Sequence, residues 1–108
     1  MRNLSQEKWR TQIYNDNNAV IIDVRTPAEC ASGILKNAVI IDFLQPIFFL
    51  KEVHKLDGTK TYYIYSRNGN RSSKACEILE DIGFNESYNL MGGINEWNSE
   101  KVIPNNCS

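Results

Sequence analysis

The segment Ser66–Ser72 contains the residue types in this sequence that are best suited to chemistry. One glycine and two asparagines between its serines permit a tight backbone curl. In such a curl, successive N–H groups can converge on one point, and the positive end of a following helix adds to their attraction for an anion. We therefore expect an anion-binding loop formed by Ser66, Arg67, Asn68, Gly69, Asn70, Arg71 and Ser72.

The two arginines of this loop are expected to add positive charge at its rim, and Ser72 or Ser73 is expected to cap the helix that follows. The alternative interpretation is an ordinary polar connection whose arginine side chains are solvated. The composition of the loop does not decide between these two interpretations, because arginine and asparagine are common in loops.

Apolar runs and helical periodicities alternate along the chain and predict how this loop is positioned. The run Ala19–Ile22 is apolar at every position, as in a parallel strand covered on both faces. Further strands are expected at residues 38–41, 61–65 and 87–90. Helices are expected after Ser5, Pro27, Pro46 and the 66–72 loop, and at Ile94–Trp97. The fold class is therefore α/β, with a mostly parallel sheet of about four to five strands and helices on both faces. In such sheets, ligands bind beyond the carboxyl ends of the strands, where the 66–72 loop begins.

The composition is typical of a globular protein, with 42% hydrophobic and 23% charged residues in 108. A net charge of −1 provides no long-range field for nucleic acid or an anionic membrane. The longest apolar stretch, Phe43–Leu50, is interrupted by Gln45 and Pro46, and no apolar leader is visible, so neither a membrane span nor a signal peptide is expected. We expect a cytoplasmic protein with one domain over residues 1–100 and a loose tail over residues 101–108.

The three cysteines, Cys30, Cys76 and Cys107, are too few and too irregularly spaced for a disulfide framework or a zinc site. We expect no metal and no cofactor.

Several charged residues are expected to support the loop. Asp23 and Arg25 end a buried strand, and Glu29 lies one helical turn beyond Arg25, so we expect an Arg25–Glu29 ion pair that braces the loop. Asp42 follows the second strand and is expected either to border the site or to cap the next helix.

Three motifs resemble those of the rhodanese-like domain family, in the family's order and over the chain from Trp9 to Trp97. Residues 66–72 resemble its active-site loop Cys-Arg-x-Gly-x-Arg-Ser, residues 23–29 its Asp-Val-Arg-x-x-x-Glu segment, and residues 90–97 its Leu-x-Gly-Gly-x-x-x-Trp ending. The resemblance implies a sulfurtransferase. Such an enzyme takes a sulfane sulfur from a donor such as thiosulfate onto a cysteine thiolate, and passes it from this persulfide to a thiol or cyanide.

Two positions depart from the family pattern. Ile34 stands where the family usually has histidine, which affects a local structural contact. Ser66 stands at the position of the nucleophilic cysteine. A serine hydroxyl ionises far above physiological pH, and the motif places no base beside it. We predict that the chain as written has negligible thiosulfate:cyanide sulfurtransferase activity.

No other residue is expected to replace the missing thiol. Cys76 would need to reach back against the packing of its own helix, Cys30 is expected to be a small buried hydrophobe, and Cys107 lies in the tail. The sole histidine, His54, is expected at the surface.

Two interpretations of Ser66 stay open. Either it replaces the cysteine of an otherwise competent sulfurtransferase, or the serine is native and the domain is a non-catalytic module that binds an anion, a persulfide carrier or a protein partner. Phosphatases of related fold have Cys-x5-Arg loops, and Arg71 comes one residue too early for that spacing. The expected ligand is a small sulfur-containing anion such as thiosulfate or a persulfide donor, with a thiol acceptor or a protein as partner.

Overall fold

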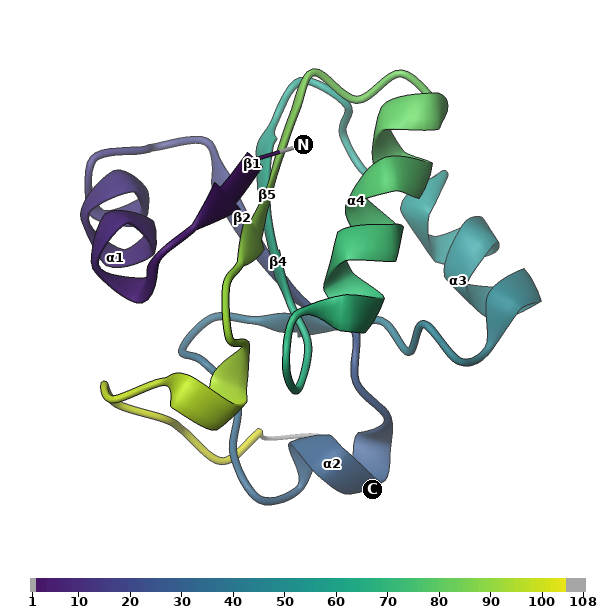
Figure 1. Cartoon of the computed structure of the whole chain (residues 1–108). Coiled ribbons are helices and arrows are strands. Elements are labelled where there is room, and N and C mark those ends of the chain that lie inside the picture. The colour runs from purple at the N-terminus through teal and green to yellow at the C-terminus, as the bar shows by residue number, and fades with distance from the viewer. Residues whose placement is uncertain (1, 105–108) are drawn as a thin grey trace.

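A five-stranded parallel sheet lies at the centre of the computed structural model, which describes residues 2–104 (Figure 1). Its strands are β1 (Arg2–Leu4), β2 (Ala19–Asp23), β3 (Val39–Ile40), β4 (Thr61–Tyr65) and β5 (Glu86–Leu90). They lie in the order β1-β5-β4-β2-β3, and every pair of neighbours is parallel. The predicted mostly parallel α/β fold is confirmed. The sequence pattern does not predict β1, because its three residues are too few to show an alternation.

Helices cover both faces of this sheet, as predicted. The helices are α1 (Gln6–Tyr14), α2 (Pro27–Cys30), α3 (Pro46–Val53), α4 (Asn70–Asp81) and the 3-10 helix η1 (Ile94–Glu96). α3 and α4 pack on one face, and α1 and η1 pack on the other (Figure 1).

The side-chain alternation of β4 divides the core into two clusters. Tyr62 and Ile64 join the cluster beneath α3 and α4. Tyr63 and Tyr65 point to the opposite face, where their rings lie 5.5 and 6.3 Å from that of Trp9 on α1. All four strand side chains are buried. β4 is therefore anchored from both sides, which fixes the position of the residue that follows it.

α1 begins as the sequence predicts. Ser5 caps it by accepting a hydrogen bond from the backbone N–H of Lys8 at 3.3 Å. Leu4 and Trp9 are buried in the same cluster, as expected of a hydrophobic staple across the start of a helix.

Two expectations about the C-terminal part are corrected. The helix expected at Ile94–Trp97 is a single 3-10 turn, and the backbone is extended again at Trp97. The tail expected to be loose from residue 101 is held at Val102, whose N–H and C=O groups bond to Ile34 at 2.8 Å each. The remaining residues, 105–108, lie outside the described part of the chain.

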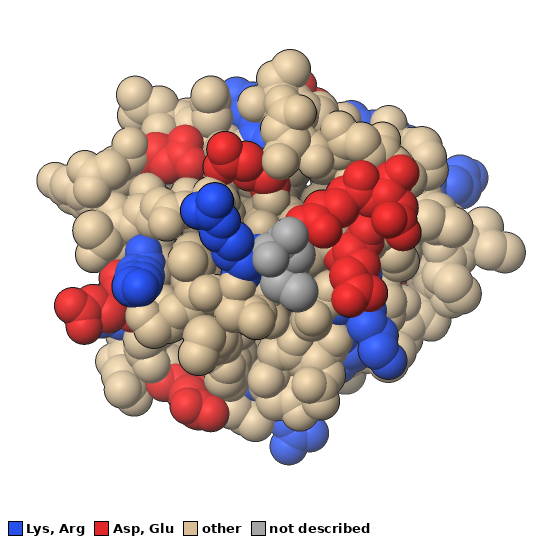
Figure 2. Space-filling view, turned by 45° about the horizontal axis from the view of Figure 1, so that its top comes forward, with Lys and Arg blue, Asp and Glu red and all other residues tan. Residues whose placement is uncertain are grey.

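Acidic and basic side chains are interspersed on the face shown in Figure 2, with no continuous basic surface there. Over residues 2–104, no helix is long and apolar enough to span a bilayer. The same residues contain no group of three or more His, Cys, Asp or Glu side chains placed to hold a metal ion.

The segment after β5 packs directly against the 66–72 loop. The backbone N–H groups of Ile94 and Asn95 donate to the carbonyl oxygens of Ser66 and Arg67, at 3.0 Å each. A Cβ atom at Gly93 would lie 2.5 Å from each of these two oxygens. Only glycine permits this close approach, and its φ of +58° also favours glycine.

Gly93→Ala is expected to lower the free energy of unfolding by about 2–4 kcal/mol, because the methyl group meets backbone atoms that cannot rotate away. Gly83→Ala is the matched control: Gly83 also has a positive φ, but a Cβ there meets no atom within 4 Å. Its expected cost is about 1 kcal/mol. Urea unfolding measures both, and equal losses for the two variants would contradict the packing argument.

Candidate functional site

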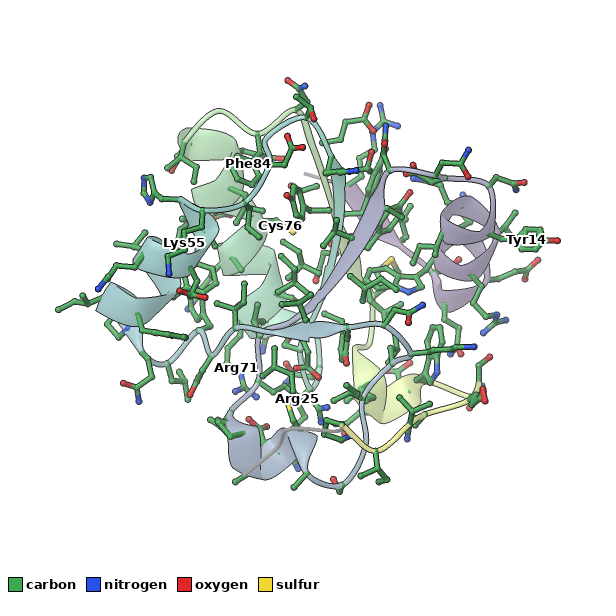
Figure 3. All side chains as sticks on the ribbon, turned by 180° about the vertical axis from the view of Figure 1, so that it is seen from behind. Tyr14, Arg25, Lys55, Arg71, Cys76 and Phe84 are labelled. Carbon is green, nitrogen blue, oxygen red and sulfur yellow. The ribbon has the colours of Figure 1, made fainter. Side chains whose placement is uncertain are left out.

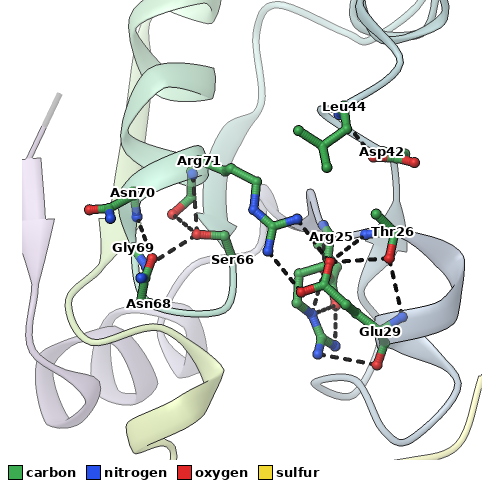
Figure 4. A network of polar contacts seen from close by, with 12 residues as sticks. Arg25, Thr26, Glu29, Asp42, Leu44, Ser66, Asn68, Gly69, Asn70 and Arg71 are labelled. Atoms are coloured by element: carbon green, nitrogen blue, oxygen red, sulfur yellow. Dashed lines mark hydrogen bonds and ion pairs between the residues drawn. The ribbon is translucent and has the colours of Figure 1, made fainter.

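The 66–72 loop curls around the side chain of Ser66, which is fully buried at the end of β4. The chain reverses at Gly69, whose φ is +99°, and α4 begins at the next residue. The backbone N–H groups of Gly69 and Ser72 donate to Ser66 Oγ, with N···O distances of 3.1 and 3.2 Å (Figure 4). Two amides from one turn of chain therefore converge on a single oxygen atom.

The expected cap of α4 is corrected. Neither Ser72 nor Ser73 precedes the helix; both lie inside it, and the N-cap residue is Gly69, which has no side chain. Ser66 Oγ accepts the N–H of Ser72 from the end of the preceding strand, and so satisfies one of the unpaired donors of the first turn. Residue spacing alone does not reveal an acceptor that arrives from another element.

Buried polar side chains continue from Ser66 toward β5. Ser66 Oγ lies 3.0 Å from Ser72 Oγ, and the hydroxyl of Ser72 donates to Asn89 Oδ1. Asn89 Nδ2 donates to the carbonyl oxygen of Gly69 at 3.3 Å and to Asn3 Oδ1 at 2.9 Å. Asn89 is a site residue that the sequence analysis missed. The sequence carried little signal for it, because its strand also contains Glu86 and Ser87, and a further polar residue does not stand out there.

The two arginines of the loop lie in different surroundings. Arg71 donates through both terminal nitrogens to the carboxylate of Glu29, at 2.8 Å each (Figure 4). This is the two-pronged geometry in which arginine–carboxylate pairs are strongest. The side chain of Arg67 is exposed. Only Arg67 therefore presents an exposed guanidinium at the rim.

The Arg71–Glu29 pair changes the titration of both groups. Hydrogen bonds from Arg71 lower the pKa of Glu29 from its ordinary value of 4.5 to about 2, burial opposes this, and a bond from the Thr26 backbone adds to it. Hydrogen bonds to Glu29 raise the pKa of Arg71. Glu29 also closes a capping box with Thr26 at the start of α2. The pair thus ties the start of α4 to the start of α2.

The expected Arg25–Glu29 ion pair is wrong. Arg25 instead binds the carboxylate of Asp23, with side-chain distances of 2.8–3.1 Å, and donates to the carbonyl oxygen of Gly33 at 2.7 Å. Asp23 and Arg25 are two residues apart at a strand end, so their side chains leave the same face. The carboxylate of Glu29 is already held by Thr26 and Arg71.

The Asp23–Arg25 pair is buried, with exposed fractions of 0% and 5%. Burial would lower the pKa of Arg25, but the hydrogen bonds and charge of Asp23 raise it. Both side chains therefore serve as a brace at the end of β2.

Asp42 does not cap α3. Its Oδ1 accepts the N–H of Leu44 at 2.9 Å, and the N-cap residue of α3, Gln45, makes no side-chain capping bond. The charge of Asp42 adds to the raised pKa of Arg71, after the larger effect of the hydrogen bonds to Glu29. In the loop itself, Asn68 Oδ1 accepts the N–H of Asn70 at 3.1 Å.

The sequence profile of the rhodanese-like domain matches residues 6–100. This chain belongs to the rhodanese-like domain family. A protein named sulfurtransferase from Allochromatium vinosum is 30% identical over 94 residues, which cover 87% of this chain and 85% of that protein. A tRNA uridine(34) hydroxylase from Pelagibacter ubique is 34% identical over 91 residues, but they cover only 30% of that protein. The crystal structure of a rhodanese-like domain protein from Staphylococcus aureus has a TM-score of 0.83 at 28% identity, covering 96% of this chain and 99% of that one.

Cys30, Cys76 and His54 of this rhodanese-like domain all lie outside the 66–72 loop. Cys76 is buried on α4, where burial raises the pKa of its thiol to about 12, and it lies well beyond Arg71 along the helix (Figure 3). Cys30 is also buried. His54 is exposed, and its Nδ1 contacts the carbonyl oxygen of Leu50 at 2.7 Å. Cys107 lies outside the described residues.

Glu29→Gln is expected to lower the free energy of unfolding by about 1 kcal/mol at neutral pH, after allowance for solvent screening of a side chain that is 27% exposed. Glutamine keeps a side-chain acceptor for the Thr26 capping box. Because the pKa of Glu29 falls from 4.5 to about 2 on folding, the ion pair stabilises the fold above pH 4.5, and this contribution is lost as the pH falls toward 2. The difference in the free energy of unfolding between Glu29→Gln and the unchanged chain should therefore disappear as the pH falls from 4.5 toward 2.

Urea unfolding at a series of pH values measures this difference. Glu52→Gln is the control, because Glu52 forms an exposed ion pair with Lys55 at 2.9 Å whose expected value is only about 0.3 kcal/mol. A loss in Glu29→Gln that stays constant with pH would show that the ion pair is not its cause.

Proposed function

We propose that this chain is a rhodanese-like sulfurtransferase scaffold that is silent in sulfur transfer, because Ser66 occupies the position of the sulfur-carrying cysteine. We propose further that its 66–72 loop binds a small sulfur-containing anion, such as thiosulfate or the persulfide of a donor. The observation that carries the proposal is that Ser66 Oγ accepts the backbone N–H groups of Gly69 and Ser72 and lies 3.0 Å from Ser72 Oγ.

The hydroxyl of Ser66 is fully hydrogen-bonded and is not available for nucleophilic attack on a sulfur donor. A hydroxyl has one hydrogen and two lone pairs. Two backbone N–H groups meet the lone pairs, and the hydrogen points to Ser72 Oγ, because the hydrogen of Ser72 is given to Asn89. A nucleophilic serine needs an adjacent base to take its proton, and a neutral hydroxyl does not serve as one.

A thiolate at the same position would be favoured by the same surroundings. The two N–H groups and the start of α4 stabilise negative charge there and lower the pKa of a thiol. Attack of this thiolate on the outer sulfur of thiosulfate breaks the S–S bond, releases sulfite and forms a persulfide. Cyanide then takes the outer sulfur as thiocyanate and restores the thiolate. These steps need sulfur at position 66, and the scaffold otherwise supports them.

Other backbone N–H groups of the loop support binding of an anion by the unchanged chain. Within residues 2–104, the backbone N–H groups of Arg67, Asn68 and Arg71 make no hydrogen bond to the protein. Arg71 lies in the first turn of α4, and Arg67 and Asn68 directly precede its N-cap residue, where the helix dipole favours negative charge. The same donors would serve a non-catalytic module that holds a persulfide carrier or a protein partner. The buried thiols of Cys30 and Cys76 fit a reducing compartment, and we propose the cytoplasm.

The geometry does not favour a phosphatase. Both terminal nitrogens of Arg71 are bound to Glu29, so this guanidinium does not offer its donor pair to a phosphate in the loop. Ser66 also lacks the thiolate that such enzymes use, as the sequence already indicates.

The unchanged chain is expected to show only background thiosulfate:cyanide sulfurtransferase activity, and Ser66→Cys is expected to exceed it by about three orders of magnitude or more. Thiocyanate formation measures the activity. Mass spectrometry of Ser66→Cys after exposure to thiosulfate alone should show a gain of one sulfur atom.

Ser66→Ala is the control for this comparison. It should match the unchanged chain in activity and lose about 1–3 kcal/mol of stability, because two buried N–H groups lose their acceptor. Sulfur transfer by the unchanged chain at a rate that Ser66→Ala abolishes would contradict the proposal. If Ser66→Cys folds but takes up no sulfur, the scaffold is not that of a sulfurtransferase.

Thiosulfate added to the isotope-labelled unchanged chain is expected to shift the amide NMR signals of Arg67, Asn68 and Arg71 more than those of α3. Arg67→Gln should weaken this binding about threefold to tenfold, since it removes the exposed charge at the rim. Lys55→Gln, a charge change on the exposed surface beyond α3, should leave binding unchanged. Shifts of equal size across the whole chain would contradict a site at the loop.

A further inference from the structure

The direction of the hydrogen bonds beneath Ser66 follows from one carbonyl group. The backbone oxygen of Gly69 can only accept a hydrogen bond, so the Asn89 side-chain atom that faces it at 3.3 Å must be the amide nitrogen. Asn3 Oδ1 accepts a second hydrogen from the same nitrogen at 2.9 Å. The carbonyl oxygen of the Asn89 side chain therefore faces Ser72, whose hydroxyl donates to it.

This orientation fixes what Ser72 offers to position 66. The single hydrogen of the Ser72 hydroxyl is given to Asn89, so the oxygen of Ser72 meets Ser66 Oγ with a lone pair at 3.0 Å. We propose that Asn89 is a positioning residue that makes Ser72 an acceptor, rather than a donor, toward the side chain at position 66. The inference rests on the proposed function in treating position 66 as the sulfur-carrying one.

The burial of this network supports the inference. Ser66 and Ser72 are fully buried, and Asn89 is 5% exposed. Over the described residues, no buried side-chain nitrogen or oxygen lacks a partner. A hydroxyl at position 66 is satisfied only if a neighbour accepts its hydrogen, and Ser72 can do so because its own hydrogen is taken by Asn89.

With cysteine at position 66, the same network would act on the thiol. A protonated thiol can donate to Ser72, as Ser66 does, and this bond favours the neutral form. The thiolate receives hydrogen bonds from the N–H groups of Gly69 and Ser72 but none from the Ser72 hydroxyl. Asn89 therefore keeps the pKa of a thiol at position 66 higher than it would be if the Ser72 hydroxyl were free to turn toward it.

The test compares full-length Ser66→Cys with Ser66→Cys carrying Asn89→Leu. Leucine has similar volume but no acceptor, so the Ser72 hydroxyl is released to donate to the thiolate. For the thiol at position 66, the pH at which alkylation by iodoacetamide reaches half its maximum rate (the alkylation midpoint) is expected to fall by about one pH unit. At a fixed pH this is a rise of about tenfold in the thiolate-to-thiol ratio. The same fall in the midpoint is expected for Asn89→Ala, which replaces Asn89→Leu in the test if the leucine variant does not fold.

Two further substitutions separate positioning from general disruption. In Ser66→Cys with Ser72→Ala, the change at Asn89 should no longer move the midpoint, because the hydroxyl through which it acts is gone. Asn3→Ala removes a neighbour of Asn89 on the side away from Ser72, and should leave the midpoint unchanged. The charged groups around the loop are the same in all of these variants: Asp23, Arg25, Glu29, Asp42, Arg67 and Arg71.

A midpoint that stays the same or rises in Asn89→Leu and Asn89→Ala would overturn the inference, as would an equal fall in the Ser72→Ala background. Alkylation reports on the thiol itself and needs no sulfur donor. A shifted midpoint in a Ser66→Cys protein that takes up no sulfur would therefore support the inference and contradict the proposed function. Sulfur uptake by Ser66→Cys with no shift of the alkylation midpoint would support the proposed function and contradict the inference about Asn89.

Discussion

The convergence of two backbone N–H groups on Ser66 Oγ is the contact on which the candidate site depends. Three elements make it possible. β4 is packed on both faces and delivers Ser66 to a fixed point, the positive φ of Gly69 turns the chain back, and Gly93 lets the segment after β5 press against the loop carbonyls. The start of α4 then supplies the second amide. Loss of any one of these would leave buried donors without an acceptor.

The charges around the loop are largely used to hold the structure. Asp23 neutralises Arg25, and Glu29 neutralises Arg71, so two of the three arginines near the site are tied to carboxylates. The Arg71–Glu29 pair links α4 to α2, and the Asp23–Arg25 pair braces the end of β2. In the proposed function, the N–H groups of the loop and Arg67 are then the groups that attract an anion. The site is therefore a set of fixed dipoles with one exposed cation, rather than a cluster of free positive charge.

The parts of the molecule that were predictable depend on local sequence. Strand β4, the loop that follows it and the cap of α1 are set by residues close together in the chain, and the patterns of apolar and turn residues show them. The partner of Arg71 and the role of Asn89 depend on which elements are neighbours in space. β5 follows β4 by a whole helix in sequence but lies beside it in the sheet, so no local pattern reveals that Asn89 reaches Ser72. Arg71 and Glu29 are likewise 42 positions apart.

A crystal structure of the unchanged chain grown in the presence of thiosulfate tests the central claim most directly. We expect Ser66 Oγ within hydrogen-bonding distance of the amide nitrogens of Gly69 and Ser72, near the 3.1 and 3.2 Å described above, with the anion against the N–H groups of Arg67, Asn68 and Arg71. An extended 66–72 segment whose amides point in different directions, or an apolar side chain filling the loop, would contradict it.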